Sequence, residues 1–283
     1  MKLAIVLNYN NYLATTQAVT CLKNSGIDKI VIVDNNSNNE SFDVLNQKFA
    51  DDGMMYVVKN AQNIGYAQGN NIGLKVLSNE KLITDDNVVF IVNPDVVVNS
   101  DLIDRVSDFI LSTPDAGVVS GVSESRRTAW HHITKLSGFL FNMWIIKWIL
   151  YKFSVEEGGT YQLRKNLNKV VPVDVVSGAF FGINTRTFHS INYFDPGTFL
   201  YYEEEALFAK LSKQKFQNYI LCDVSYFHKG RASTTSSKLV SKKRSDESRL
   251  FILKKYYKLP KFVENLMVYI NKFDNFLFFL LSR

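Results

Sequence analysis

Two kinds of segment alternate along the first 95 residues of the chain. Short continuous apolar runs predict strands at 3–7, 29–33, 55–58 and 88–92, and helical spacing predicts helices at 13–22, 42–49 and 70–77. Continuous apolar strands are typical of a parallel sheet that is covered on both faces. The order therefore predicts an α/β fold with a Rossmann-like, mostly parallel sheet and helices on both faces.

The second half of the chain has a less regular pattern. Residues 126–170 are aromatic-rich and amphipathic and end in a basic loop, and helical or strand character returns at 171–183, 199–211 and 219–227. The most apolar later segments, 139–151 and 276–281, are shorter than the about 20 residues that a membrane-spanning helix needs. The N-terminal apolar run is too short for a signal peptide, so we expect a first strand and a cytoplasmic protein.

Polar clusters follow three of the predicted strands. They are Asn8-Tyr9-Asn10, Asp34-Asn35-Asn36-Ser37 and Asn93-Pro94-Asp95. In open parallel sheets, ligands bind beyond the carboxyl ends of the strands, which is where these clusters lie. A carboxylate at Asp34 suits the ribose or base of a nucleotide, although a helix cap or an Asx-turn is the alternative.

A glycine- and asparagine-rich segment lies between a predicted strand and a predicted helix. It reads Asn63-Ile64-Gly65-Tyr66-Ala67-Gln68-Gly69-Asn70-Asn71-Ile72-Gly73-Leu74. Glycines let backbone N–H groups approach a phosphate, and a helix N-terminus favours an anion. The segment matches neither common phosphate-binding fingerprint, so a loop with a capped helix is the alternative.

Three further positions are candidates for the chemistry. Asp95 suits a hard divalent cation, which commonly takes one or two protein carboxylates and substrate phosphates, although Asn-Pro also signals a turn. Glu203-Glu204-Glu205 offers a general base whose pKa neighbouring carboxylates raise, or favourable charges at a helix start. His228 suits a metal or a diphosphate, or a structural role.

The formal net charge of +6 conceals a gradient along the chain. Residues 1–125 carry a net −7, residues 126–227 a net +4 and residues 228–283 a net +9. The distribution suggests two surfaces with different partners. Two cysteines exclude a disulfide scaffold, and 46% apolar content argues against a disordered chain.

The order and spacing of these motifs resemble a known family. The match is carried by Asn8-Tyr9-Asn10, Val33-Asp34-Asn35-Asn36-Ser37, Asn63-Ile64-Gly65-Tyr66-Ala67 with Gly69-Asn70-Asn71, Asn93-Pro94-Asp95-Val96, Ser177-Gly178-Ala179-Phe180, Phe194-Asp195 through Tyr201-Tyr202-Glu203-Glu204, and His228-Lys229-Gly230-Arg231-Ala232-Ser233. They resemble the family 2 glycosyltransferases, in particular the rhamnosyltransferase- and galactosyltransferase-like bacterial enzymes that build surface polysaccharides such as capsule. The resemblance covers about residues 1–235.

The resemblance implies a GT-A fold over 1–235, with a nucleotide-sugar-binding half at 1–125 and an acceptor-binding half at 126–235. It also implies an inverting hexosyl transfer from a nucleotide-diphosphate sugar, with UDP or dTDP as the nucleotide and Mg²⁺ or Mn²⁺ as cofactor. In the metal motif, Asn93 replaces the more usual first aspartate. The base motif falls on Glu203-Glu204, where Glu204 replaces a usual Asp and Ala206 replaces a second Asp of many relatives. Glu204 is the expected base, with Glu203 as the alternative.

The resemblance assigns the remaining site residues. Those expected to bind the nucleotide sugar are Asn8, Tyr9, Asn10, Asp34, Asn36, Asn63, Gly65, Tyr66, Asn70, Asn93 and Asp95. Ser177, Gly178 and Trp130 are expected at the acceptor. Asp95 and His228 are expected at the metal, and His228 and Arg231 are expected to assist at the diphosphate.

Residues 236–283 are expected to form a basic, aromatic helical extension that associates with a membrane. The segment 241–261 holds eight basic residues against Asp246 and Glu247, and residues 126–170 hold eight against two glutamates. Apolar and basic faces suit an interfacial helix on an anionic membrane, at whose inner leaflet a polyprenyl-diphosphate-linked saccharide acceptor would lie. For 126–170, packing on the core or a homodimer contact is the alternative.

Two other functions remain as alternatives. Asn93 and Ala206 leave room for a catalytically inactive nucleotide-sugar-binding scaffold of the same fold. A sequence pI near 9.1 and the basic tail favour nucleic-acid binding. Against nucleic acid, the sequence contains no recognised binding module and its acidic half would repel phosphate, so we expect no such partner.

Overall fold

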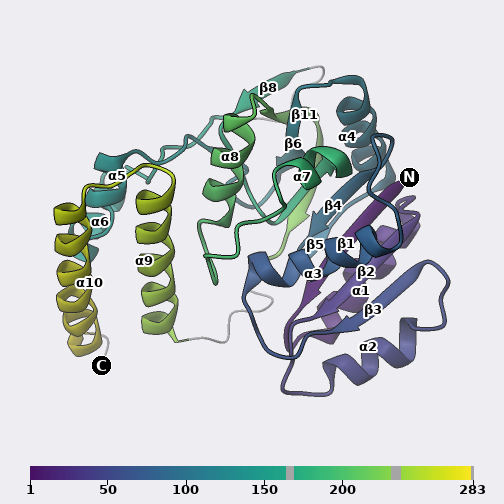
Figure 1. The fold of residues 1–283 in the computed structure, drawn as a ribbon, viewed down its shortest axis with the longest axis horizontal. Coiled ribbons are helices and arrows are strands. Elements are labelled where there is room, and N and C mark those ends of the chain that lie inside the picture. Colours follow the sequence, from purple (N-terminus) through teal and green to yellow (C-terminus); the bar gives the residue numbers. More distant parts are fainter. Residues whose placement is uncertain (164–168, 231–236, 282–283) are drawn as a thin grey trace.

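A central mixed sheet organises the computed structural model, which describes residues 1–163, 169–230 and 237–281 (Figure 1). Within those residues the sheet has nine strands. They are β1 (Lys2–Asn8), β2 (Lys29–Asp34), β3 (Met55–Lys59), β4 (Val88–Val92), β5 (Val96–Val97), β6 (Ala116–Ser123), β8 (Val170–Val173), β10 (Phe180–Asn184) and β11 (Gln217–His228). A separate pair of strands consists of β7 (Ala129–Trp130) and β9 (Val175–Val176).

The strand order is β3-β2-β1-β4-β10-β6-β11-β5, and β8 also pairs with β11. The first four strands are parallel, as the apolar runs predict. Strand β10 then lies antiparallel between β4 and β6. Residues 171–183, expected to have strand character throughout, form three separate strands because β8 pairs with β11, β9 with β7 and β10 with β4.

Helices cover both faces of the sheet, as the sequence pattern predicts. The helices are α1 (Tyr12–Asn24), α2 (Ser41–Phe49), α3 (Tyr66–Asn79), α4 (Ser100–Ser112), α5 (Lys135–Leu140), α6 (Trp144–Lys152), α7 (Thr185–Ser190), α8 (Glu203–Lys213), α9 (Lys238–Lys255) and α10 (Lys261–Leu281). Because side chains alternate along a strand, Ala4 and Val6 join the core under α1, α2 and α4, whereas Leu3 and Ile5 join the core under α3, α7 and α8.

Two helices begin four residues away from the start that the sequence pattern predicts. Helix α3 begins at Tyr66, four residues earlier than expected, since Gly65 ends the preceding loop at φ +84°. Helix α8 begins at Glu203, four residues later than expected. Tyr201 and Tyr202 interrupt the helix there, with left-handed φ values of 72° and 65°.

Of the C-terminal helices, α9 packs against α5 and α8, and α10 packs against α9 (Figure 1). A third hydrophobic cluster joins them to the sheet domain through Ile133, Ala206, Ile252, Leu253 and Met267. The expected helical character of the C-terminal extension is confirmed. Within the described ranges, no helix is both long and apolar enough to cross a bilayer.

Candidate functional site

A cleft of about 580 Å³ opens at the carboxyl ends of β1, β2 and β4, where the polar clusters were predicted to meet. We call it the first cavity. Of the predicted residues, those that line it are Tyr9, Asn63, Gly65, Tyr66, Asn93, Asp95, Ser177, Gly178, Glu203, Glu204 and His228. The fold thus brings together predicted site residues from both halves of the chain.

Asp34 lies at the end of β2, fully buried, behind the wall of this cavity. Its carboxylate accepts hydrogen bonds from the Asn8 amide at 2.7 Å, from the Ser37 hydroxyl at 2.6 Å and from the Ser37 backbone N–H at 2.9 Å. The Asn8 carbonyl in turn accepts from Thr15. Asn8 and Asp34 therefore order the turn after β2, and neither lines the cavity.

Three other predicted residues also lie outside the cavity lining. Asn10 and Asn36 have left-handed φ values of 57° and 60° and shape the two loops beyond β1 and β2. Asparagine adopts this conformation more readily than most residues, which explains its abundance here. Asn70 is buried in α3, and its amide donates to the Tyr66 carbonyl oxygen.

The glycine- and asparagine-rich segment joins the two halves of the site. A Cβ at Gly65 would lie 2.2 Å from the Phe199 carbonyl oxygen, so only glycine permits this approach. The Tyr66 backbone N–H donates to the same oxygen at 2.8 Å, and the Tyr66 hydroxyl donates to the Gly178 carbonyl at 2.6 Å. These contacts hold the 63–66 loop against the segment that precedes α8.

Asp95 and His228 form the pair that suits a metal ion. The His228 Nε2 lies 3.2 Å from the Asp95 Oδ2, and both residues line the first cavity. No group of three or more His, Cys, Asp or Glu gathers anywhere in the described parts of the chain. Mg²⁺ and similar cations keep several waters and bind one or two protein carboxylates plus substrate phosphates, so this pair fits such an ion.

The three consecutive glutamates at the start of α8 face different surroundings, as their helical spacing of about 100° requires. Glu205 accepts hydrogen bonds from the Trp130 indole at 3.0 Å and from the Ile133 backbone N–H at 3.2 Å, and burial raises its pKa to about 8. Glu203 is 6% exposed, and its Oε2 has no hydrogen-bond partner within the described structure. Burial and the neighbouring Glu204 raise its pKa well above the usual range.

Glu204 is held in place by the backbone of Gly178. The Gly178 N–H donates to the Glu204 Oε1 at 3.1 Å, and a Cβ at position 178 would lie 2.8 Å from that oxygen. Burial raises the pKa of Glu204, and the Gly178 hydrogen bond partly offsets the increase. Glu204 thus combines a fixed carboxylate with a raised proton affinity, which is what a general base needs.

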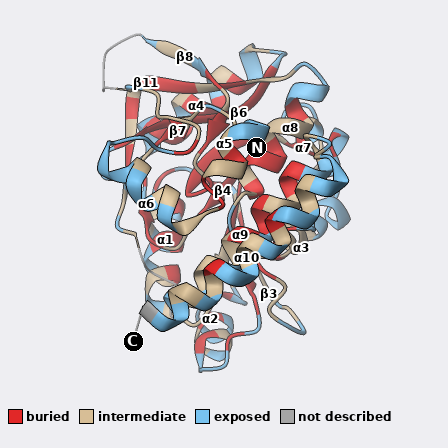
Figure 2. Ribbon diagram, turned by 90° about the vertical axis from the view of Figure 1, so that its left-hand side faces the viewer, coloured by how far each residue is buried: buried red, intermediate tan, exposed pale blue. Residues whose placement is uncertain are grey.

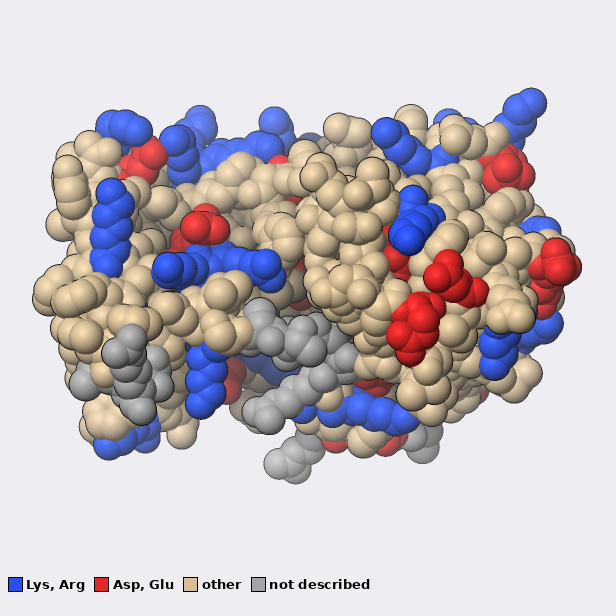
Figure 3. Space-filling view, turned by 90° about the horizontal axis from the view of Figure 1, so that it is seen from below, with Lys and Arg blue, Asp and Glu red and all other residues tan. Residues whose placement is uncertain are grey.

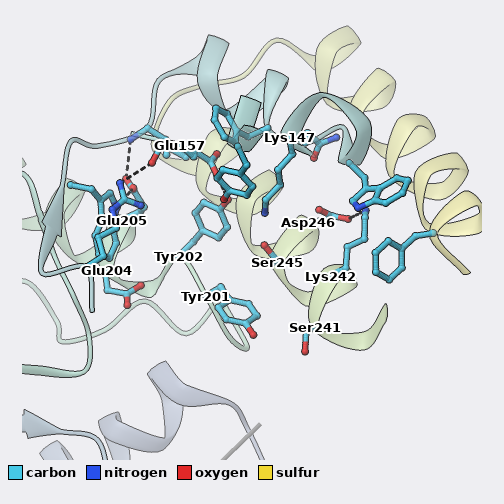
Figure 4. A pocket seen from close by; sticks show the side chains of 18 residues that line it. Lys147, Glu157, Tyr201, Tyr202, Glu204, Glu205, Ser241, Lys242, Ser245 and Asp246 are labelled. Carbon is cyan, nitrogen blue, oxygen red and sulfur yellow. Dashed lines mark hydrogen bonds and ion pairs between the residues drawn. The ribbon is translucent and has the colours of Figure 1, made fainter. Parts of the chain in front are cut away.

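A second cavity of about 520 Å³ adjoins the first (Figure 4). Residues of α6, α8, α9 and α10 line it, together with Trp130 and Glu157. Two residues, Tyr201 and Glu204, line both cavities. Glu204 therefore lies at the junction between them, and Trp130, expected at the acceptor, belongs to the second cavity.

The sequence reasoning missed several residues of the first cavity. Arg244 of α9 lines it, with its guanidinium 4.0 Å from the centre of the Phe199 ring. Asn35 also lines it and donates from its amide to Asn63 and to the Gly65 carbonyl. The sequence predicts the basic segment 241–261 to face a membrane, and the structure places Arg244 of that segment in the lining of the first cavity. Arg231 lies outside the described residues.

Comparisons with solved structures show the fold. The structure of GalNAc-T7 with UDP, GalNAc and Mn²⁺ matches with a TM-score of 0.66 at 14% identity, over 91% of this chain and 49% of that one. A mannosyltransferase from Pyrobaculum calidifontis with GDP-Man and Mn²⁺ matches with a TM-score of 0.59 at 13% identity, over 97% and 71%. S. aureus TarS matches with a TM-score of 0.56 at 14% identity, over 94% and 42%.

The chain thus spans about half the length of the GalNAc-T7 and TarS chains that it matches. No curated protein sequence matches it. Residues 4–191, which are more than half of the chain, match the sequence profile described as glycosyl transferase family 2. The fold of the GT-A glycosyltransferases and this profile agree with the motifs of the cleft, and the chain belongs to the family 2 glycosyltransferases.

Proposed function

We propose that the chain is an inverting glycosyltransferase that moves a hexosyl group from a nucleotide-diphosphate sugar to a saccharide acceptor. The donor lies in the first cavity and the acceptor in the second, near Trp130, with Ser177 and Gly178 where the two sugars meet. The observation that carries this proposal is the position of Glu204, which lines both cavities. A base at such a junction reaches an acceptor hydroxyl that faces a donor sugar.

The reaction is a single displacement. The Glu204 carboxylate takes the proton of the acceptor hydroxyl as that oxygen attacks the anomeric carbon, and the bond to the diphosphate breaks on the opposite face. The Gly178 N–H orients the carboxylate. Burial and the neighbouring Glu204 raise the pKa of Glu203 well above the usual range, which favours its neutral form and limits the negative charge beside the base.

Asp95 and His228 are the residues that would hold Mg²⁺ or Mn²⁺. Such a cation, when bound, offsets the negative charge of the departing nucleoside diphosphate. Two matched structures contain Mn²⁺ beside UDP or GDP-Man, and we extend that chemistry to this chain as part of the proposal. The Asp95–His228 pair supports it because both side chains reach the same cavity.

The experiment that tests the function is thermal unfolding with UDP, dTDP and GDP, each with and without Mn²⁺, followed by hydrolysis of the matching nucleotide sugars. A ligand that binds only the folded state raises the unfolding temperature. We expect UDP or dTDP with Mn²⁺ to do so, and their sugars to be hydrolysed. Stabilisation by a nucleotide without any hydrolysis or transfer would indicate a catalytically inactive nucleotide-sugar-binding scaffold. If no nucleotide stabilised the protein, the proposed glycosyltransferase function would be wrong.

Arg244 is expected to contact the diphosphate of the donor, since it lines the first cavity from α9. Substitution of Arg244 by Gln removes a charge-assisted hydrogen bond, so we expect the nucleotide to bind about 10-fold more weakly or worse. Lys243→Gln is the matched control, because Lys243 lines a separate groove between α9 and α10. Calorimetric titration measures both, and equal affinities in the two variants would remove Arg244 from the site.

We further propose that the protein works at the cytoplasmic face of a membrane, on a polyprenyl-diphosphate-linked acceptor of surface polysaccharide synthesis. Helix α10 carries a stripe of exposed apolar side chains at helical spacing: Phe262, Leu266, Tyr269, Phe273 and Phe276. Their exposed fractions lie between 46% and 74%, and Figure 2 looks onto this helix. A soluble monomer rarely exposes so continuous an apolar strip.

Helix α6 extends this surface. Its residues Ile145, Trp148 and Ile149 are exposed, and Ile145 meets Tyr269 and Phe273 in a shallow cavity between the two helices. The acidic residues of α10 are compensated, Glu264 by Lys254 and Lys261 and Asp274 by Lys242. Figure 3 shows Lys and Arg side chains around this end of the molecule, amid mostly uncharged surface. Apolar and basic character together suit an anionic lipid surface.

The double substitution Phe262→Ser and Phe273→Ser removes two exposed anchors of this surface. We expect it to weaken binding to phosphatidylserine-containing vesicles at low salt by about 10-fold or more, because each buried phenyl contributes roughly 1.5–3 kcal/mol. Co-sedimentation measures the binding. Leu111→Ser, at an apolar residue of α4 that is 50% exposed, should bind as the wild type does. If the wild-type protein stayed in the supernatant, the membrane proposal would be wrong.

A further inference from the structure

The second cavity contains a lysine, Lys147, that forms no ion pair within the described structure. Among its basic lining residues, Arg127 pairs with Glu156 at 3.4 Å, and Lys242 pairs with Asp246 and Asp274 at 2.7 Å each. Lys147 has no carboxylate within ion-pair distance in the described structure, and its ammonium lies 5.6 Å from the centre of the Tyr151 ring. Burial and the positive charge of Arg249 lower the pKa of Lys147, and the carboxylates of Glu157 and Asp246 offset this decrease only in part.

A second polar group in the same cavity also lacks a partner. Asn142 is 1% exposed and lines the cavity, and neither its amide nitrogen nor its amide oxygen has a hydrogen-bond partner among the described residues. Buried polar groups are nearly always paired, so each exception calls for an explanation. Polar atoms of a bound acceptor would form hydrogen bonds with this amide and so explain the exception.

Helix α6 places Lys147 directly behind the proposed lipid-facing surface. Trp144, Lys147 and Tyr151 follow one another at helical spacing and line the cavity. The exposed Ile145 and Ile149 lie on another face of the helix, and the exposed Trp148 lies between the two faces. Figure 4 shows Lys147 directed into the cavity, on a different side of it from Glu204.

We propose that the second cavity binds an anionic substituent of the acceptor, a phosphate or a carboxylate, through the Lys147 ammonium and the Asn142 amide. The inference rests on the proposed function, because it takes this cavity as the acceptor site. The reacting hydroxyl then lies at Glu204, and the anionic group lies toward α6. The nearby apolar surface favours a lipid-linked phosphate as the source, and a carboxylate of an acidic sugar is the second source that the test distinguishes.

The test uses geranyl phosphate with geraniol as its neutral counterpart, and glucuronate with glucose. Binding to the full chain is measured calorimetrically for the wild type, for Lys147→Gln and for Lys152→Gln. Lys152 is the matched control, since it lies on the same helix, exposed, with its ammonium 3.8 Å from the centre of the Trp148 ring. We expect geranyl phosphate to bind about 10-fold more weakly, or worse, to Lys147→Gln alone, because a charged hydrogen bond is lost.

The outcomes separate the two sources. A loss confined to geranyl phosphate identifies a phosphate, and a loss confined to glucuronate identifies an acidic sugar. Equal affinity of wild type and Lys147→Gln for both acids, or no preference of the acids over their neutral counterparts, overturns the proposal. Nucleotide binding should be the same in all three proteins, so that a failure of the donor site is recognised separately by the thermal unfolding experiment.

Discussion

Substitution of Glu204 by Gln is expected to lower sugar transfer by about 10²- to 10⁴-fold, which is the usual contribution of a general base. The amide keeps the size of the side chain but cannot take a proton from the acceptor hydroxyl. The Gly178 N–H still finds an oxygen at this position, so the segment should stay ordered. Donor affinity should therefore remain within a few-fold of the wild-type value, measured by titration with the nucleotide.

Glu203→Gln is the matched control for this substitution. Glu203 is buried and its pKa is raised well above the usual range, so its neutral form is favoured. Glutamine imitates that neutral form, and transfer should change by only a few-fold. The reverse pattern, with Glu203→Gln inactive and Glu204→Gln active, would move the role of base to Glu203.

The same assignment predicts the pH dependence of transfer. Burial raises the pKa of Glu204, and a base must be ionised to act. Activity should therefore fall as the pH is lowered through this raised pKa, at a pH above the ordinary glutamate pKa of 4.5. In Glu204→Gln the residual rate of transfer should no longer fall as the pH is lowered.

Substitution of Arg249 by Ala should cost about 3–5 kcal/mol of the free energy of unfolding, because it leaves the buried carboxylate of Glu157 without its cationic partner. Arg249 is 1% exposed on α9 and lies 3.2 Å from both Glu157 and Asp246. The Tyr202 hydroxyl donates to the same Glu157 at 2.6 Å. A domain is stable by only about 5–15 kcal/mol, so urea unfolding should show a large loss.

The exposed neighbour Lys243 provides the control, since Lys243→Ala should change the unfolding free energy by no more than about 0.5 kcal/mol. The double variant Glu157→Gln with Arg249→Met removes one charge together with its partner. It should recover part of the loss, because replacing both members of a buried pair is tolerated better than removing one. If Arg249→Ala were as stable as Lys243→Ala, the buried ion pairs would contribute nothing.

Residue patterns that are local in the sequence predicted the first half of the fold. The apolar runs that become β1 to β4 and the polar clusters after them need only periodicity and turn chemistry. The antiparallel insertion of β10 was not predictable in this way. The partners of β10, β4 and β6, are distant in the chain. The apolar pattern of 171–183 also does not show that this run forms three strands, each with different partners.

In the candidate site, too, local sequence patterns predicted some residues, whereas contacts between segments that are distant in the chain were not predictable. Asp95, Glu204 and His228 follow strands or open a helix, so their place at one edge of the sheet could be expected. For Asp34 the sequence left a nucleotide contact and an Asx-turn open, and only the structure shows that Asn8 and Ser37 donate hydrogen bonds to its carboxylate. Arg244 was missed since a basic run looks the same in sequence whether its side chains face lipid or a cleft.

The position of Arg244 also bears on what the C-terminal helices are for. Removal of the residues after 235 would take away more than the proposed lipid-facing surface. It would uncover the apolar contacts of Ile133 and Ala206 with Leu253 and Ile252, and it would withdraw one wall of the first cavity. If Arg244 contacts the donor as proposed, a chimaera that keeps donor recognition must inherit α9 together with the sheet domain.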